Sequence, residues 1–284
     1  MFIDFHAHFN HAEPDLVRAF VKNCEKNECI AAMSGGLHYG GHDMVPNEEV
    51  IRLCKQYSDW LVPMAKIELW DKEPDLDELH KLVDMGARGV KCIYPYYPYD
   101  HDLYMPLYEE CEKLGLPMLF HTGNYRPNPA DRVSRRPILK NMDPLNLDRA
   151  ARSFPNLHIV IAHLGTTFWR LQAAEMLKMH SNVYADLAGS GSWLTLSAED
   201  LAELLCPPAF LCRDNEKFFK KLVFGSDCYI DYPHVQTQGK LHYMQILLKI
   251  GDFPEITSAV MGGTVASWLN IKFENPVTKP SYRF

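Results

Sequence analysis

The chain has 284 residues, of which 47% are hydrophobic and 23% are charged, as in an ordinary globular protein. Its formal net charge is −7, from 29 basic and 36 acidic residues, and it has no basic run, which argues against a general nucleic-acid-binding protein. No uninterrupted apolar stretch of about 18 residues occurs, which argues against a membrane-spanning helix, and the first residues lack the pattern of a signal peptide.

The eight cysteines are scattered, without the close pairs that are typical of zinc knuckles or redox motifs. A chain of this size does not need disulfides for stability. We therefore expect reduced, mostly buried thiols in a cytoplasmic protein.

Short runs rich in β-branched and aromatic residues alternate with longer helical patterns along the chain. The predicted strands are residues 2–8, 29–35, 61–69, 88–94, 117–123, 157–165, 182–189 and 221–228. The predicted helices are residues 14–27, 47–59, 75–86, 104–115, 144–154 and 166–180, with closing helices in 232–250 and 262–271. In residues 75–86, Leu79 and Leu82 mark one apolar face, and Gly86 stands where a glycine commonly ends a helix.

Eight strands that alternate with helices indicate an α/β protein with a (β/α)8 TIM barrel, here as one domain over residues 1–284 with extra C-terminal helices. The alternative is an open, doubly wound sheet. Polar residues recur at the strand ends, and the sequence has neither a GxGxxG turn after its first strand nor a Walker-type phosphate loop, so the barrel is favoured.

The first strand ends in His6-Ala7-His8, a pattern that suits metal binding. Because side chains alternate along a strand, His6 and His8 should project from one face, together with Asp4. Two adjacent imidazoles on rigid backbone can grip zinc. Taken alone, such a pair is more often two polar residues at a strand end or two hydrogen-bonded core histidines.

Three further strand ends carry polar residues: His121, His163 and Asp227. Each has an ordinary structural explanation, because a histidine after an apolar run is often a hydrogen-bonded core residue and Asp227 could cap a following helix. In a barrel, however, the carboxyl ends of the strands meet at one mouth, where active sites are built. Burying this many polar groups together without a metal would carry a large desolvation cost. The joint pattern therefore predicts a metal site.

These segments resemble the amidohydrolase superfamily, within it the amidohydrolase-related branch that includes aminocarboxymuconate-semialdehyde decarboxylase and small-lactone hydrolases. The matching segments are IDFHAH, FPNLHIVIAHLG, VFGSDC and the late MGGTVASWLNI, in which Thr264 replaces the usual asparagine. The resemblance spans nearly the whole chain. It is specific for the superfamily and not for a substrate.

The resemblance implies that one divalent metal, with zinc as the expected ion, is bound by His6, His8, His121 and Asp227. His163 would lie just outside the metal's ligands and orient water or substrate. Lys91, on the fourth strand, is the one candidate for the bridge between metals that binuclear relatives use. Because a buried lysine that pairs with a carboxylate or with substrate explains Lys91 as well, we expect one metal. Asp4 could orient one of the imidazoles.

We expect a metal-dependent hydrolase that attacks the carbonyl of a lactone, ester or amide. Asp227 would accept the proton of the activated water and pass it to the leaving group, and the metal or His163 would stabilise the oxyanion. The alternative is a decarboxylase that uses the same residues, with a protonated Asp227 donating to carbon before CO2 departs. A metal-binding protein without catalysis is disfavoured, because all the ligands and the acid/base group are present.

The loops after the strands suggest a small, anionic substrate. Arg126, five residues after His121, could bind a carboxylate, and Lys91 could do the same. Tyr94 begins a tyrosine-rich loop that could form an aromatic wall or simply pack, and Trp193 could cover the site. We expect no nucleic-acid or membrane partner, and the sequence is compatible with a homo-oligomer.

Overall fold

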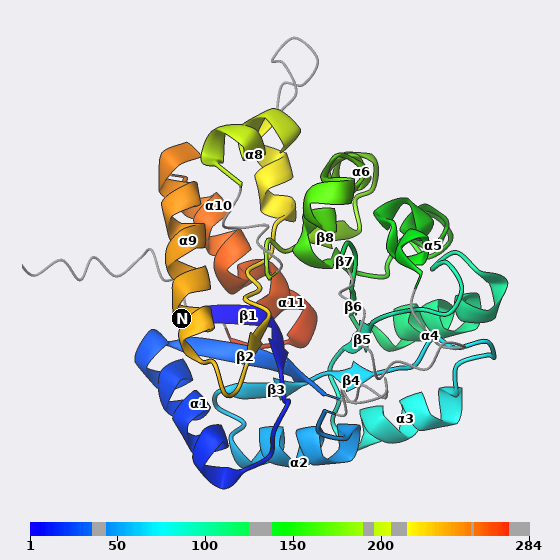
Figure 1. Cartoon of the computed structure of the whole chain (residues 1–284), viewed down its shortest axis with the longest axis vertical. Helices are drawn as coiled ribbons and strands as arrows, with labels where there is room; N and C mark the ends of the chain where they lie inside the picture. The colour runs from blue at the N-terminus through cyan, green and yellow to red at the C-terminus, as the bar shows by residue number, and fades with distance from the viewer. Residues whose placement is uncertain (36–43, 125–137, 190–195, 206–214, 251–252, 273–284) are drawn as a thin grey trace, which may run out of the picture.

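The computed structural model describes residues 1–35, 44–124, 138–189, 196–205, 215–250 and 253–272. Its strands lie at the centre of the molecule, with helices around them (Figure 1). The strands are β1 Phe2–His8, β2 Cys29–Ser34, β3 Leu61–Pro63, β4 Ala65–Lys66, β5 Val90–Cys92, β6 Met118–Phe120, β7 Ile159–Ile161, β8 Val183–Ala185 and β9 Cys228–Tyr229.

All strand pairs are parallel, in two sheets of order β3-β2-β1-β9 and β4-β5-β6-β7-β8. The predicted strand at 61–69 joins the sheets, because its first half, β3, pairs with β2 and its second half, β4, pairs with β5. On the other side, the predicted strand at 221–228 does the same.

In that second joining segment, Leu222 forms a bridge with Ala185 at the end of β8. Two residues later, the carbonyl of Phe224 accepts a hydrogen bond of 2.9 Å from Phe5 N of β1. The nine short strands therefore correspond to eight barrel segments, and the (β/α)8 prediction is confirmed.

The helices follow the predicted pattern closely, and α1 matches its predicted range. They are α1 Pro14–Asn27, α2 Asn47–Gln56, α3 Leu76–Asp84, α4 Met105–Leu114, α5 Asp148–Ser153, α6 Thr166–Met179, α8 Ala198–Leu205, α9 His234–Ile250, α10 Pro254–Ser258 and α11 Thr264–Leu269. Shorter helical turns are η1 Asp102–Tyr104, η3 Leu139–Met142, η4 Pro144–Leu147, η5 Ala162–Gly165, η6 Asn215–Lys221 and η7 Ala259–Gly263. Helix α8 was not among the predicted elements.

Local chemistry explains where these helices begin and end. Asp75 caps α3 by accepting a hydrogen bond of 3.0 Å from Glu78 N, and Leu79 and Leu82 of that helix are buried, as predicted. Gly86, with φ 114°, follows the end of α3. Gly115 ends α4 with φ 66°, a backbone conformation that glycine adopts without a steric cost.

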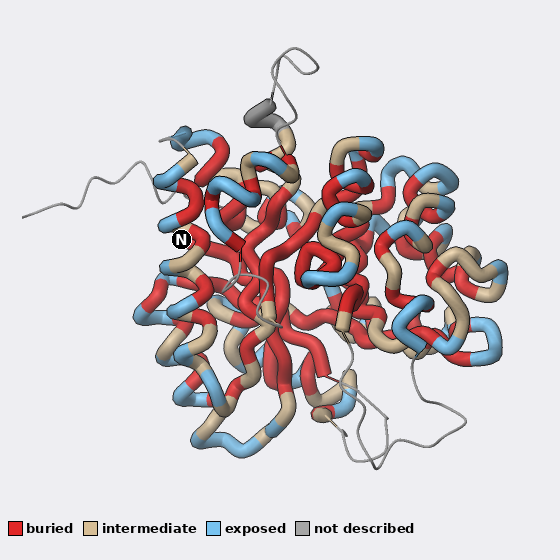
Figure 2. Tube along the Cα trace, turned by 45° about the horizontal axis from the view of Figure 1, so that its top comes forward, coloured by how far each residue is buried: buried red, intermediate tan, exposed pale blue. Residues whose placement is uncertain are grey.

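An apolar cluster fills the barrel interior toward the N-terminal ends of the strands. Ile3, Phe5 and Val223 of the barrel wall pack there with Val265 and Leu269 of α11. The closing helix therefore seals this end, and the opposite end remains for a polar site. Figure 2 shows the buried strands inside a layer of helices that are exposed on their outer side.

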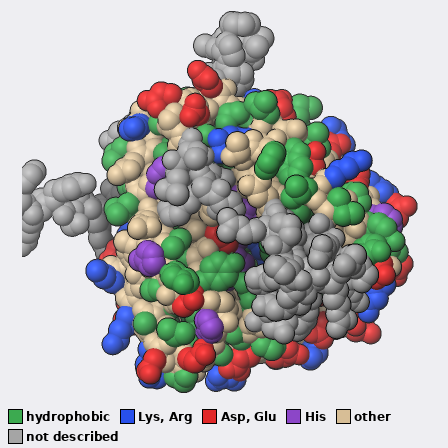
Figure 3. Space-filling model, in the orientation of Figure 1, with side chains coloured by type: hydrophobic (Ala, Val, Ile, Leu, Met, Phe, Trp, Pro, Cys, Tyr) green, Lys and Arg blue, Asp and Glu red, His purple; other side chains and the backbone are tan. Residues whose placement is uncertain are grey.

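Basic and acidic side chains are interspersed over the face in Figure 3 wherever described residues are drawn. Among the helices that the structure describes, none combines the length and the apolar character that a membrane span requires.

Candidate metal centre

The two histidines of β1 face the mouth of the barrel, but Asp4 does not. The pairing of β1 with β2 shifts register between Asp4 and Ala7. Phe5 belongs to the barrel interior and Asp4 points outward, toward α9. The expectation that Asp4 shares a face with His6 and His8 and orients an imidazole is therefore wrong, because the irregularity in the strand breaks the alternation.

Four imidazole rings form a continuous row across the mouth. The ring centroids lie 5.1 Å apart for His8 and His6, 5.2 Å for His6 and His163, and 5.0 Å for His163 and His121. His121 directly follows β6, and His163 lies in the turn η5 that follows β7. The barrel therefore brings together all four predicted histidines, from three separate strands.

Two carboxylates lie against this row. Asp227 Oδ1 is 3.3 Å from His6 Nε2 and 3.0 Å from His8 Nε2. Asp186 Oδ2 is 2.9 Å from His6 Nδ1, on the other side of the ring, and Asp186 Oδ1 accepts a hydrogen bond of 2.7 Å from His163 N. Asp186 was not among the predicted site residues, although it directly follows β8 just as His121 directly follows β6.

Hydrogen bonds set the tautomers of the two β1 histidines. His6 Nδ1 donates to Asp186, and His8 Nδ1 lies 3.0 Å from Ser34 Oγ, whose own proton goes to Ala7 O. In their neutral forms both rings therefore present the Nε2 lone pair toward Asp227 Oδ1. Acceptors that converge at about 3 Å need a cation or a proton between them.

The rings of His163 and His121 also face each other with a lone pair on each of the two facing nitrogens. His163 Nδ1 donates to Ala188 O at 2.6 Å, which leaves a lone pair on Nε2. His121 Nε2 faces Asn124 O at 3.1 Å, so it carries the proton of a neutral ring, and its Nδ1 meets His163 Nε2 at 3.2 Å. A shared proton or a cation must lie between these two nitrogens.

Burial keeps the imidazoles of His6, His8 and His121 neutral, which is the form that binds metals. It lowers the pKa of His6 to about 4, with a further contribution from the charge of Lys91. Burial also lowers the pKa of His8, and it lowers the pKa of His121 well below its ordinary value. Burial alone would raise the pKa of Asp227, but the surrounding histidines outweigh it and hold that pKa well below its usual range.

The donor set fits a divalent cation. Ligands of a tetrahedral zinc site with bonds of about 2.0–2.1 Å lie about 3.3 Å apart, which is close to the 3.3 and 3.0 Å that separate Asp227 Oδ1 from His6 Nε2 and His8 Nε2. Among the described residues, two groups could hold a metal: His6, His8 and Asp227, and His6, His163 and Asp186. His121 belongs to neither group and lies at the far end of the row, so its place among the ligands stays a prediction.

Lys91 of β5 reaches the same point from another strand. It is 1% exposed, and its Nζ lies 2.8 Å from His6 Nε2. Burial lowers its pKa to about 8, while Asp227 and Asp186 partly oppose this shift. The lysine therefore lies within the cluster of site residues and not in a separate structural ion pair.

The backbone around the mouth is held in unusual conformations. Tyr94, His163, Leu164 and Asp227 have φ values of 53°, 65°, 43° and 57°, in the left-handed region that non-glycine residues avoid. Gly189 lies against Asp227, and a Cβ at Gly189 would be 2.2 Å from Asp227 Oδ2. Strain concentrated where side chains converge is typical of functional sites.

The remaining predicted site residues lie at the edge of this cluster or outside the described chain. The ring of Tyr94 contacts His121, with 4.9 Å between the centroids. Tyr99, in the same loop, is buried and donates to His121 O at 2.6 Å, so that part of the loop packs beneath the site. Arg126 and Trp193 lie outside the described residues.

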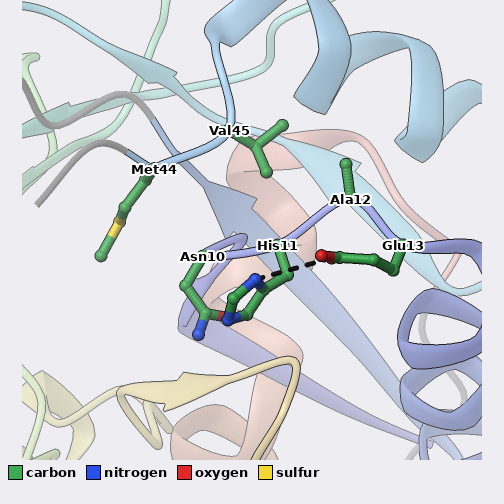
Figure 4. A pocket seen from close by; sticks show the side chains of 6 residues that line it. All are labelled: Asn10, His11, Ala12, Glu13, Met44 and Val45. Atoms are coloured by element: carbon green, nitrogen blue, oxygen red, sulfur yellow. Dashed lines mark ion pairs between the residues drawn. The ribbon is translucent and has the colours of Figure 1, made fainter.

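Beyond β1, the chain lines an open hollow of about 510 Å³. Figure 4 shows its lining residues, with His11 pointing toward Glu13 across 3.5 Å. The lining residues are Asn10, His11, Ala12, Glu13, Met44 and Val45. This hollow begins two residues after His8 and therefore lies at the mouth end of β1.

The comparison with protein families agrees with this geometry. Residues 3–264 match the family model described as amidohydrolase. The chain belongs to the amidohydrolase family. Membership supports an enzyme with a metal-dependent hydrolase activity or a related one, and the resemblance inferred from the strand-end motifs is confirmed.

Solved structures agree with the fold of this amidohydrolase. An uncharacterized TIM-barrel protein from Bordetella bronchiseptica matches with a TM-score of 0.69 at 18% identity, over 95% of this chain and 98% of its own. A probable 2-pyrone-4,6-dicarboxylic acid hydrolase from Acinetobacter baumannii matches with a TM-score of 0.62 at 14% identity, over 95% and 99% of the two chains. No curated protein matches the chain.

Proposed function

We propose that this amidohydrolase is a metal-dependent hydrolase that acts on the carbonyl of a small, anionic lactone, ester or amide. The observation that carries the proposal is the convergence of His6 Nε2, His8 Nε2 and Asp227 Oδ1 on one point at the barrel mouth. A single zinc ion held there, with His121 as a further ligand, would activate water and polarise the substrate carbonyl.

Asp227 is the acid/base group in this proposal. Its side chain is 20% exposed, more than the imidazoles beside it, so it can meet both water and substrate. Because the neighbouring histidines keep its pKa low, Asp227 is ionised at neutral pH and can accept a proton from the attacking water. The same carboxyl then delivers that proton to the leaving group. The metal or His163 would stabilise the developing oxyanion.

Lys91 supplies the positive charge for an anionic substrate. Its Nζ donates to the Nε2 lone pair of His6, and a metal ligand cannot offer that lone pair twice. When His6 binds the metal, the Lys91 ammonium must turn to another acceptor, and a substrate carboxylate at the mouth provides one. Tyr94, beside His121, would line the substrate pocket. Arg126 and Trp193, which lie outside the described residues, are proposed as further substrate-binding residues.

A hydrolase named for 2-pyrone-4,6-dicarboxylic acid is among the structural neighbours, and that name is compatible with a cyclic, dianionic ester as substrate. Six cysteines of the described chain are free and buried, which supports the proposal of a reduced, cytoplasmic protein.

Product analysis tests the proposed reaction. Zinc-loaded and metal-stripped protein would be incubated with a panel of lactones, esters, amides and hydroxy-aromatic acids, while proton release and CO2 release are followed in parallel. We expect metal-dependent proton release from an anionic lactone or ester without CO2. Release of CO2 from a hydroxy-aromatic acid would instead assign the decarboxylase chemistry of the same family.

A further inference from the structure

Behind the metal centre lies a buried carboxylate that the proposed chemistry does not use. Asp4 has no exposed surface, and four nitrogen and oxygen donors surround it, with Cys228 Sγ as a fifth, weaker donor at 3.9 Å from Oδ2. Oδ1 accepts from His6 N at 3.2 Å and from Ser226 N at 2.9 Å. Oδ2 accepts from Ser226 Oγ at 2.6 Å and from Gln236 Nε2 at 3.1 Å.

These donors belong to the two segments that carry the candidate metal ligands and to helix α9. One is the backbone of His6 itself, and Ser226 immediately precedes Asp227. Ser226 Oγ also accepts from Cys228 N at 3.2 Å, so the residues on both sides of Asp227 are tied to the same group. Asp227 N donates to His6 O at 2.7 Å, which joins the two segments a second time.

This arrangement explains how the left-handed Asp227 is held in place. A non-glycine residue with φ 57° persists only where its surroundings determine its conformation. The flanking peptide groups at Ser226 and Cys228 are fixed by hydrogen bonds to Asp4 and to the Ser226 hydroxyl. The register shift in β1 turns Asp4 outward to where it can do this.

We propose that Asp4, with Ser226 and Gln236, is a positioning unit that sets the distance between His6 and Asp227 and so tunes metal binding. The inference rests on the proposed metal site. Asp4 touches neither metal nor substrate, and it acts through the backbone of the two ligand-bearing segments. Residues that orient metal ligands commonly change metal affinity about 10- to 100-fold when they are replaced.

Gln236 fixes the polarity of the unit from helix α9. Its Oε1 accepts from Asn23 Nδ2 of α1 at 2.9 Å, so its Nε2 must point at Asp4. If the Gln236 amide turned over, its oxygen would face the carboxylate and the bond to Asn23 would be lost. The unit therefore accepts a carboxylate at position 4 and opposes a group that donates.

The Asp4→Asn variant tests the unit, because its amide would direct protons at Ser226 Oγ and Gln236 Nε2. We expect zinc affinity, measured by competition with a chelator, to fall about 10- to 100-fold. We also expect the visible absorption of cobalt-loaded protein to change, because that spectrum reports the geometry of the ligands. Both readouts are independent of turnover.

The double variant Asp4→Asn/Gln236→Glu exchanges the amide and the carboxylate and restores complementarity. The amide now at position 4 would donate to the carboxylate now at position 236, which would still accept from Asn23. We expect zinc affinity and the cobalt spectrum to return toward wild type, whereas Gln236→Glu alone sets two carboxylates together and should remain impaired. Rescue by the pair is not expected if Asp4 only fills space.

A stability control comes from another hydrogen bond between helices α1 and α9. Asn27 Nδ2 donates to Thr237 Oγ1 at 2.9 Å and does not reach Asp4. Asn27→Ala should lower the melting temperature and leave zinc affinity unchanged. If Asp4→Asn does not fold, Ser226→Ala removes the hydroxyl that bonds Asp4 and Cys228 N and should weaken zinc binding measurably, by up to about 10-fold.

Unchanged zinc affinity and an unchanged cobalt spectrum in folded Asp4→Asn, or in Ser226→Ala if that variant replaces it, would overturn the inference while the proposed metal site stands. Wild-type protein that binds no zinc would overturn the proposed function, and the inference with it.

Discussion

The two ends of the barrel are built on opposite principles. At the N-terminal ends of the strands, Ile3, Phe5 and Val223 pack against α11 in an apolar plug. At the other end, imidazoles, carboxylates and Lys91 converge with strained backbone at Tyr94, His163 and Asp227. The sealed end supplies stability, and a rigid frame of this kind can hold costly polar and strained groups in place at the open end.

The largest expected effect is at the open end, in Asp227→Asn. The amide cannot accept a proton from water, so we expect kcat to fall by about 10²- to 10⁴-fold. Metal content is measured alongside, because Asp227 is also a proposed ligand. A variant that retains its zinc and turns over like wild type would remove Asp227 from the acid/base role.

A substitution at the sealed end should change stability and not metal binding. Leu269→Ala leaves a cavity in the plug and is expected to cost about 2–5 kcal/mol in the free energy of unfolding, measured with urea. Zinc affinity and KM of the folded variant should stay at wild-type values. A large change in zinc affinity would show that the two ends are not independent.

Asp186→Asn tests the carboxylate behind His6. Asp186 Oδ2 accepts a hydrogen bond from His6 Nδ1. Loss of the Asp186 carboxylate should therefore weaken zinc binding by about 10- to 100-fold, as measured by chelator competition. Asp148→Asn is the control, since Asp148 bonds His180 in the same manner at 2.8 Å outside the site. Equal zinc affinities of the two variants would contradict the role given to Asp186.

The smallest effect is a pH dependence of the metal-free protein. Burial lowers the pKa of His6 to about 4 from an ordinary 6.5. Between about pH 4 and pH 6.5, His6 is therefore protonated in the unfolded chain and neutral in the folded protein. Stability should therefore fall as the pH falls, by about 2 kcal/mol at pH 5 for this group. Between pH 7 and pH 5, the free energy of unfolding of chelator-treated wild type should fall by about 2 kcal/mol more than that of His6→Asn. If the two proteins lose the same free energy of unfolding over this range, the effect assigned to His6 is excluded.

The sequence predicts the frame and the site because both depend on simple periodicity. Strand ends in a barrel converge, so the order of residues along the chain is enough to expect that His6, His8, His121, His163 and Asp227 meet. Asp186 gives the same signal at the end of its strand. The resemblance to the family assigns it no role, so the matching motifs alone do not select it.

Other features depend on tertiary structure that periodicity does not carry. The strand at 61–69 divides between two sheets because barrel closure requires it. The direction of Asp4 depends on a register shift that no alternation pattern reveals. The alternation predicts that Asp4 orients an imidazole. Because of the shift Asp4 points outward, and Asp186 contacts His6 Nδ1 instead.

Anomalous diffraction at the zinc edge, from crystals of zinc-loaded protein, tests the central claim most directly. We predict one peak at the barrel mouth, about 2.0–2.1 Å from His6 Nε2, His8 Nε2 and a carboxylate oxygen of Asp227. A protein that takes up less than about a tenth of an equivalent of zinc, or a peak that none of these three residues contacts, would contradict the account.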